Sequence, residues 1–124
     1  MINGKENILY EKAYAFAVKV VEAHQYLGQE KREYILAGQL LRSGTSIGAS
    51  VVEANSAVSE EAFLEKLALA YQECQETKDW LDLLKDTHFI DKEQYRSLYG
   101  EAEELCQLLS NSIRSGEDIL MDNA

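Results

Sequence analysis

Apolar residues recur at helical spacing in four segments of this chain, separated by short polar stretches. The first segment carries two neighbouring apolar seams, which together make a face wider than one neighbouring helix would cover. One seam holds Tyr10, Tyr14, Ala17, Val21 and His24, and the other holds Leu9, Ala13, Phe16, Val20, Ala23 and Leu27. The pattern predicts a helix over about residues 5–27, which we expect to end at Gly28 because glycine often follows a helix C-terminus.

The second segment is almost free of charge. Between Tyr34 and Val58 only Arg42 and Glu53 are charged, whereas a helix on the surface needs a solvated polar face. We therefore expect a central helix over about residues 31–54 that packs on several sides, as in an oligomer. The two charges and the many Ser, Thr and Asn residues make a membrane span unfavourable.

Two glycines stand out in the second predicted helix. Gly44 and Gly48 lie one turn apart, so both are on one face, and each costs about 1 kcal/mol relative to alanine. We expect a neighbouring helix to approach the backbone closely at both glycines. A break of the helix near Gly44 is the alternative.

Capping patterns mark the start of the last two helices. Ser59, followed by two glutamates, predicts the N-cap of a helix over about residues 59–86. Asp91 with Gln94 predicts a capping box at the start of a helix over about residues 91–115. The expected inner stripes are Phe63, Leu67, Ala70, Cys74, Leu81 and Leu84, then Tyr95, Leu98, Ala102, Leu105 and Leu109, and the expected solvated side of the third helix holds Glu65, Glu73, Glu76 and Asp79.

Four long helices with short connections predict an all-α protein, an antiparallel up-down four-helix bundle in which residues 1–124 form a single domain. We expect the fourth helix to end at Gly116. The absence of proline and the abundance of Leu, Ala, Glu, Gln and Lys agree with this class.

The composition indicates which cellular environment and which binding partners to expect. The 12 basic and 22 acidic residues give a formal net charge of −10, which repels phosphate backbones, so we do not expect generic nucleic-acid binding. The N-terminal sequence MINGKENILYEKAY lacks the features of a cleavable signal peptide, and we expect a cytoplasmic protein. Cys74 and Cys106 lie in apolar stripes and are expected to be reduced core thiols, with a disulfide or a metal pair as the alternative.

No catalytic, cofactor-binding or metal-binding residues are predicted. A di-iron bundle needs Glu-x-x-His pairs, but Val21 stands three positions before His24 and Lys85 three positions before His88. The stretch GTSIG over residues 44–48 has the spacing Gly-x-Ser-x-Gly, but Ser46 lies within a predicted helix with no histidine nearby in sequence, so it does not predict a nucleophile elbow. The same stretch lacks the lysine and the strand context of a phosphate-binding loop. We therefore expect a protein that is not an enzyme.

Arg42 and Glu53 share one face of the second helix. Eleven residues place them three turns and about 16 Å apart, so they cannot bond to each other. We expect each to bridge to another helix or to a neighbouring subunit, because an unpaired charge on a packed helix is unfavourable. The alternative is that they line a shared cavity or a ligand site.

A family resemblance rests on three stretches: QLLRSGTSIGASVVEA over residues 39–54, KAYAFAVKVVEAHQYL before it and SEEAFLEKLALAYQECQETKDWLDLL after it. Together they resemble the four-helix-bundle proteins linked to bacterial 23S ribosomal RNA intervening sequences. The residues that align with the family motif are Arg42, Ser43, Ser46, Ile47 and Glu53. Ser50 stands where the family usually has Asn.

The resemblance implies an antiparallel four-helix bundle that assembles into a ring of five. It suggests a non-enzymatic assembly or adaptor module whose partners are copies of itself and a protein partner that the sequence does not name. The accessory protein of diversity-generating retroelements is similar in fold, which raises the alternative of an accessory protein that binds RNA or a reverse transcriptase through a restricted patch. Relatives that bind nucleic acid are basic, unlike this chain.

Overall fold

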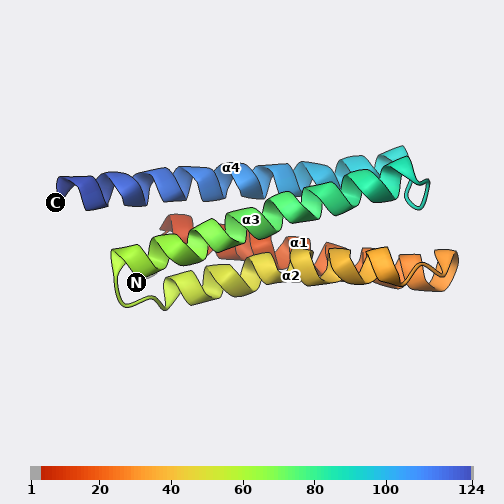
Figure 1. Ribbon diagram of the computed structural model, residues 1–124, viewed down its shortest axis with the longest axis horizontal. Coiled ribbons are helices and arrows are strands. Elements are labelled where there is room, and N and C mark those ends of the chain that lie inside the picture. The colour runs from red at the N-terminus through yellow and green to blue at the C-terminus, as the bar shows by residue number, and fades with distance from the viewer. Residues whose placement is uncertain (1–3, 124) are drawn as a thin grey trace.

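The computed structural model describes residues 4–123, and they form an antiparallel up-down bundle of long helices (Figure 1). In chain order these are α1 (Gly4–Lys31), α2 (Ile35–Asn55), α3 (Glu60–Asp86) and α4 (Lys92–Asp122). Each helix packs against the next, and α1 also packs against α4. The α1–α2 and α3–α4 turns lie at one end of the bundle, which we call the turn end, and the two termini lie toward the other (Figure 1). The predicted all-α class and up-down bundle are confirmed.

Only one of the two apolar seams of α1 is buried. Its core residues are Leu9, Ala13, Phe16, Val20 and Leu27, none more than 2% exposed. On the other seam the side chains of Tyr10, Tyr14 and Val21 stay 37%, 62% and 38% exposed. The apolar surface of α1 is therefore larger than the three other helices of one chain cover.

Both predicted helix caps are present. The Ser59 hydroxyl accepts a hydrogen bond from the Ala62 amide at 3.1 Å, at the start of α3. At the start of α4 the Asp91 carboxylate accepts from the Gln94 amide at 2.8 Å, and the Gln94 side chain accepts from the Asp91 amide at 2.9 Å. Such caps need only adjacent residues, which explains why the sequence pattern located them.

The predicted end of α1 at Gly28 is wrong. The helix continues to Lys31, and the chain turns at Arg32, whose φ is 52°. The Glu33 amide then donates to the Leu27 carbonyl at 3.0 Å. Glycine permits a helix to stop but does not force it, and here the buried Leu27 keeps the last turns packed.

The predicted end of α4 at Gly116 is also wrong, since the helix reaches Asp122. Gly116 is buried, and a Cβ placed on it would lie 2.5 Å from Cδ2 of Leu64. This glycine therefore allows α3 and α4 to approach each other and does not terminate the helix. The alternative of a break near Gly44 is likewise not observed, because α2 is continuous from Ile35 to Asn55.

The second helix is not enclosed within one chain. It packs against α1 and α3 and keeps an open side, where Ile35 is 79% and Val52 46% exposed. The low charge of this segment predicted that α2 packs on several sides. A single chain supplies neighbouring helices on only some of those sides. No helix in the described range is long and apolar enough to cross a membrane.

Candidate functional site at the seam between α2 and α3

The family-motif residues lie mainly along the seam where α2 meets α3, so this seam is the candidate site. Arg42 forms an ion pair with Glu76 of α3, and its guanidinium also donates to Gln39 Oε1 at 3.1 and 3.2 Å. The Trp80 indole donates to the same Glu76 carboxylate at 3.1 Å. Arg42 is thus held between a residue of its own helix and one of α3, with 54% of its side chain exposed.

A buried hydroxyl pair lies next along the seam. Ser43 and Thr77 are both fully buried, and their hydroxyl oxygens are 3.0 Å apart. Thr77 also reaches the Glu73 carbonyl at 2.8 Å. Ser43 accepts from the Thr77 hydroxyl and donates to the Leu40 carbonyl of its own helix at 3.4 Å, so the Ser43 hydroxyl has both a donor and an acceptor as partners. The pair ties α2 to α3 without leaving a buried polar atom unpaired.

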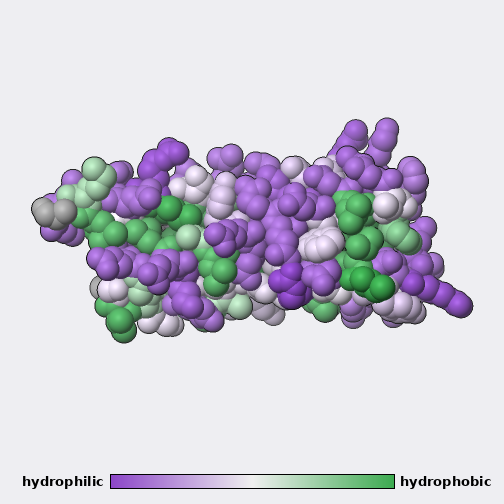
Figure 2. Space-filling model, viewed as in Figure 1, coloured by the Kyte–Doolittle hydropathy of each residue, from purple (hydrophilic) through white to green (hydrophobic). Residues whose placement is uncertain are grey.

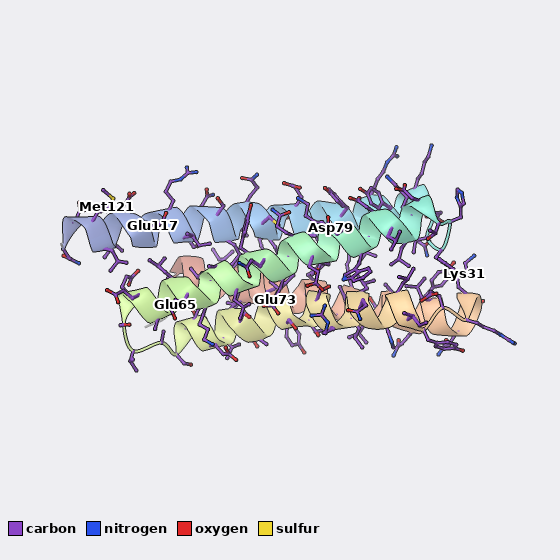
Figure 3. The ribbon with its side chains drawn as sticks, viewed as in Figure 1. Lys31, Glu65, Glu73, Asp79, Glu117 and Met121 are labelled. Carbon is purple, nitrogen blue, oxygen red and sulfur yellow. The ribbon has the colours of Figure 1, made fainter. Side chains whose placement is uncertain are left out.

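Two further contacts complete the seam. The Ser50 hydroxyl donates to the Glu73 carboxylate at 2.6 Å, and Glu53 forms an ion pair with Lys66 at 2.8 Å. Figure 3 shows Glu73 on the side of α3 that faces α2. Of the residues expected on the solvated side of α3, Glu65 and Asp79 are exposed, whereas Glu73 and Glu76 are only partly exposed because both bind residues of α2.

The remaining motif residues do not join this network. The Ser46 hydroxyl donates to the Arg42 carbonyl of its own helix at 2.6 Å, and Ile47 is fully buried in the core. Arg42 and Glu53 each bridge to α3, which is the predicted role of an interhelical bridge. The motif thus brings together contacts that set the packing of α2 on α3, and it does not converge on one point where a ligand would sit.

The two glycines of α2 differ in their surroundings. A Cβ on Gly44 would lie 2.8 and 2.9 Å from the two methyl carbons of Val20, so α1 approaches the α2 backbone closely there. At Gly48 the nearest atom would be the Ala13 Cβ at 3.9 Å, an ordinary contact. The expected close approach is therefore found at Gly44 and is not met at Gly48, where α1 offers only a small side chain.

Sequence reasoning missed Thr77, and it left the pairing of the two cysteines open as an alternative to separate core thiols. Thr77 could have been found, since it lies at helical spacing between Cys74 and Leu81 in the inner stripe of α3. The contact between Cys74 and Cys106 could only be raised as an alternative, because it depends on how α3 and α4 are aligned. Both thiols are buried, with their sulfurs 2.9 Å apart.

The clefts of the bundle differ in their lining. One of about 450 Å³ between α1 and the start of α4 is lined by Lys19, Glu22, Asp91 and Glu93, among others. An apolar cleft of about 350 Å³ opens between the start of α1 and the last turns of α4, and Glu60 is its one titratable lining residue. Within residues 4–123 no group of three or more His, Cys, Asp or Glu side chains could hold a metal ion. His24 is half-buried on α1, and His88 is exposed in the α3–α4 turn.

Comparison with known proteins agrees with the fold. The family model described as 23S rRNA-intervening sequence protein matches residues 5–111. A crystal structure of a protein of unknown function from the S23 ribosomal protein family of Bacteroides thetaiotaomicron is 41% identical and superposes with a TM-score of 0.88. That match covers 89% of this chain and 98% of the other. No curated protein sequence matches the chain.

Proposed function

The chain belongs to the 23S rRNA-intervening sequence protein family, and we propose that it is a non-enzymatic module that assembles with copies of itself. The proposed assembly is a ring of five that serves as an assembly or adaptor unit for a protein partner. The observation that carries this proposal is the uncovered apolar seam of α1. The number five is supported by the resemblance of the sequence to a family of ring-forming bundles.

Five large apolar side chains form an exposed surface on α1 and α2, which we call the α1–α2 face. It consists of Tyr10, Tyr14, Val18, Val21 and Val52, each between 37% and 62% exposed. These two helices also pack directly on each other through Val20 and Gly44. Contiguous apolar surface of this kind is unusual on a monomer and typically marks an interface.

The α2 part of this face carries few charges. From Ile35 to Val52 the only charged residue of α2 is Arg42, which is already paired with Glu76. Small residues such as Gly38 and Ala49 lie on the open side of α2 and would let a neighbouring helix come close. The face of the bundle formed by α2, α3 and α4, with α1 behind it, is largely hydrophilic, with separate hydrophobic areas (Figure 2). A second copy is therefore the partner whose apolar chemistry fits the α1–α2 face best.

We expect the purified chain to sediment as an oligomer at micromolar concentration. A ring of five chains of 14.0 kDa would have a mass of about 70 kDa. Sedimentation equilibrium over a range of concentrations measures this mass without assuming a shape. A single species at the mass of one chain across that range would overturn the proposal, and a stable dimer or trimer would overturn the ring of five alone.

A second candidate function is favoured by the distribution of charge. Segments 30–33 and 85–96 both lie at the turn end of the bundle, where Lys31 is labelled (Figure 3). They hold five of the 12 basic and five of the 22 acidic residues, so their formal charge is zero and the rest of the chain carries the whole −10. The turn end is thus where a phosphate backbone would meet the least repulsion.

Several cations at the turn end are also available. Lys31, Arg32, Lys92 and Arg96 are exposed and have no ion-pair partner among the described residues. Two of the carboxylates there are occupied by helix termini, since Glu33 accepts from the Leu36 amide and Asp91 from the Gln94 amide. An accessory protein that holds RNA would therefore use this restricted patch.

We expect no measurable binding of unrelated oligonucleotides near ~150 mM salt, because a few cations cannot offset the charge of the remaining chain. At about 20 mM salt, any binding through the turn end should be lost in Arg96→Glu and kept in Arg114→Glu. The two arginines form a matched pair, since both are exposed on α4 and neither has an ion-pair partner among the described residues. Fluorescence anisotropy measures the binding at both salt concentrations. Tight binding near ~150 mM salt that weakens steeply with added salt would make RNA binding the first candidate function.

A further inference from the structure

Cys74 of α3 and Cys106 of α4 face each other inside the bundle. Their sulfurs are 2.9 Å apart, and the Cys74 thiol lies 3.1 Å from the Ala102 carbonyl. A disulfide bond is about 2.05 Å long, so a movement of less than about 1 Å separates the two thiols from bonding distance. Helices α3 and α4 hold the pair in register, because both residues belong to buried stripes of long, packed helices.

The geometry points to a modification site: we propose that Cys74 and Cys106 are an oxidisable dithiol that peroxide converts to a disulfide joining α3 to α4. This proposal does not depend on the assembly proposed above. It uses only the placement of the two sulfurs and the groups around them.

The two thiols have different surroundings, which assigns them different roles. Cys106 is 3% exposed and lies toward the surface, whereas Cys74 is fully buried. The pKa of Cys106 is lowered, first by its hydrogen bond with Cys74 and further by the positive charge of Lys78. The pKa of Cys74 is raised by its hydrogen bond with Cys106 and by burial. Cys106 is therefore the thiol that reacts first, and Cys74 is the one that resolves the product.

Lys78 is well placed to keep its charge beside the pair. Its ammonium group forms an ion pair with Glu103 at 2.7 Å, and only 13% of its side chain is exposed. It also lies 5.2 Å from the centre of the Tyr99 ring. The hydrogen bond to Glu103 raises the pKa of Lys78, which favours its protonated form.

The reaction balances with hydrogen peroxide as the oxidant. The Cys106 thiolate attacks one peroxide oxygen, so that an S–O bond forms, the O–O bond breaks and the departing hydroxide takes up the proton that Cys106 had released. The Cys74 sulfur then attacks the sulfur of the Cys106 sulfenic acid. An S–S bond forms, the S–O bond breaks, and water leaves with the proton of Cys74. Two thiols are oxidised by two electrons, and one peroxide is reduced to two waters.

The disulfide would close a loop that contains the α3–α4 turn. Closing a loop of this length restricts the unfolded chain, while the native pair needs little rearrangement. We therefore expect the melting temperature of the oxidised protein to rise by on the order of 10 °C, and the rise to vanish after reduction.

The test treats the reduced full-length chain with peroxide, blocks remaining thiols with N-ethylmaleimide in denaturant and measures the intact mass. The expected product is a single chain about 2 Da lighter than the reduced protein, with no thiol left to alkylate. Reduction should restore two alkylatable thiols. A protein that keeps both thiols free after prolonged treatment, or that cross-links only between chains, would overturn the proposal.

Two alanine variants separate the roles of the thiols. Cys74→Ala lacks the resolving thiol, so Cys106 should gain about 32 Da as a sulfinic acid and no disulfide should form within the chain. Cys106→Ala should react at least about tenfold more slowly, because Cys74 is buried and its pKa is raised. Equal rates for the two variants would overturn the assignment of roles. Circular dichroism checks that both variants fold, and the wild-type mass change does not depend on them.

Discussion

Replacing Gly44 with alanine is expected to destabilise the protein by about 1–2 kcal/mol, although alanine is the better helix former. The added Cβ would lie 2.8 Å from a methyl carbon of Val20, closer than packed atoms approach. Val20 is fully buried and β-branched, so it has little freedom to turn away. Either α1 moves away from α2 or the valine takes a strained rotamer.

Gly48→Ala is the matched control, one turn away on the same helix. Its Cβ would meet Ala13 at 3.9 Å, so helix propensity should dominate and raise the stability by roughly 0.5–1 kcal/mol. Urea unfolding of both variants at equal protein concentration measures the two effects. If the two substitutions change stability equally, the close approach at Gly44 has no energetic consequence.

The Val20→Ala background identifies the partner of Gly44. Val20→Ala leaves a cavity and destabilises the protein by itself, but it removes the atoms that the new Cβ would touch. Gly44→Ala should therefore be close to neutral in this background, and the double-mutant cycle should give a favourable coupling of about 1 kcal/mol or more. Additive effects would show that the strain arises elsewhere.

Val21→Glu is expected to convert the proposed oligomer to single chains that remain folded. Val21 is 38% exposed on the α1–α2 face, so a glutamate there is solvated in one chain. In the assembly the same carboxylate would be buried against an apolar neighbour in each of the interfaces, which costs several kcal/mol per site. The expected readout is a sedimenting mass near that of one chain, with an unchanged helical circular dichroism spectrum.

Leu69→Glu supplies the control for this variant. Leu69 is 42% exposed on α3, a helix outside the α1–α2 face. Its replacement by glutamate introduces the same charge at a similarly exposed apolar position. This variant should sediment as the wild-type protein does. An oligomer that survives Val21→Glu but dissociates with Leu69→Glu would move the interface from α1 and α2 to α3.

The helices and the starts of α3 and α4 could be predicted because they depend on neighbouring residues. Ser59 caps α3 and Asp91 caps α4 through bonds within one turn, and such bonds are written in short sequence patterns. The ends of α1 and α4 were placed wrongly for the opposite reason. Whether Gly28 or Gly116 ends a helix depends on what packs beside it, and at Gly116 a leucine of α3 does.

The candidate site also has features that the sequence predicts and features that it does not. The sequence indicated that Arg42 and Glu53 need partners on another helix, because charges on a packed helix must be compensated. It could not indicate that the partners are Glu76 and Lys66, since several carboxylates and lysines on α3 were available. The rotation and register of α3 against α2 select the pair, and these are set by the packing of the whole bundle.

The amino-acid pattern alone was sufficient for the helical class, the up-down order of the helices and the excess of apolar surface on α1. Each of these follows from periodicity, capping or composition, which act over a few turns of chain. The tertiary structure was needed to show that α1 approaches α2 at Gly44 and not at Gly48, and that Cys74 meets Cys106. Such contacts join residues from different helices, and their distances depend on how side chains from all four helices fill a common core.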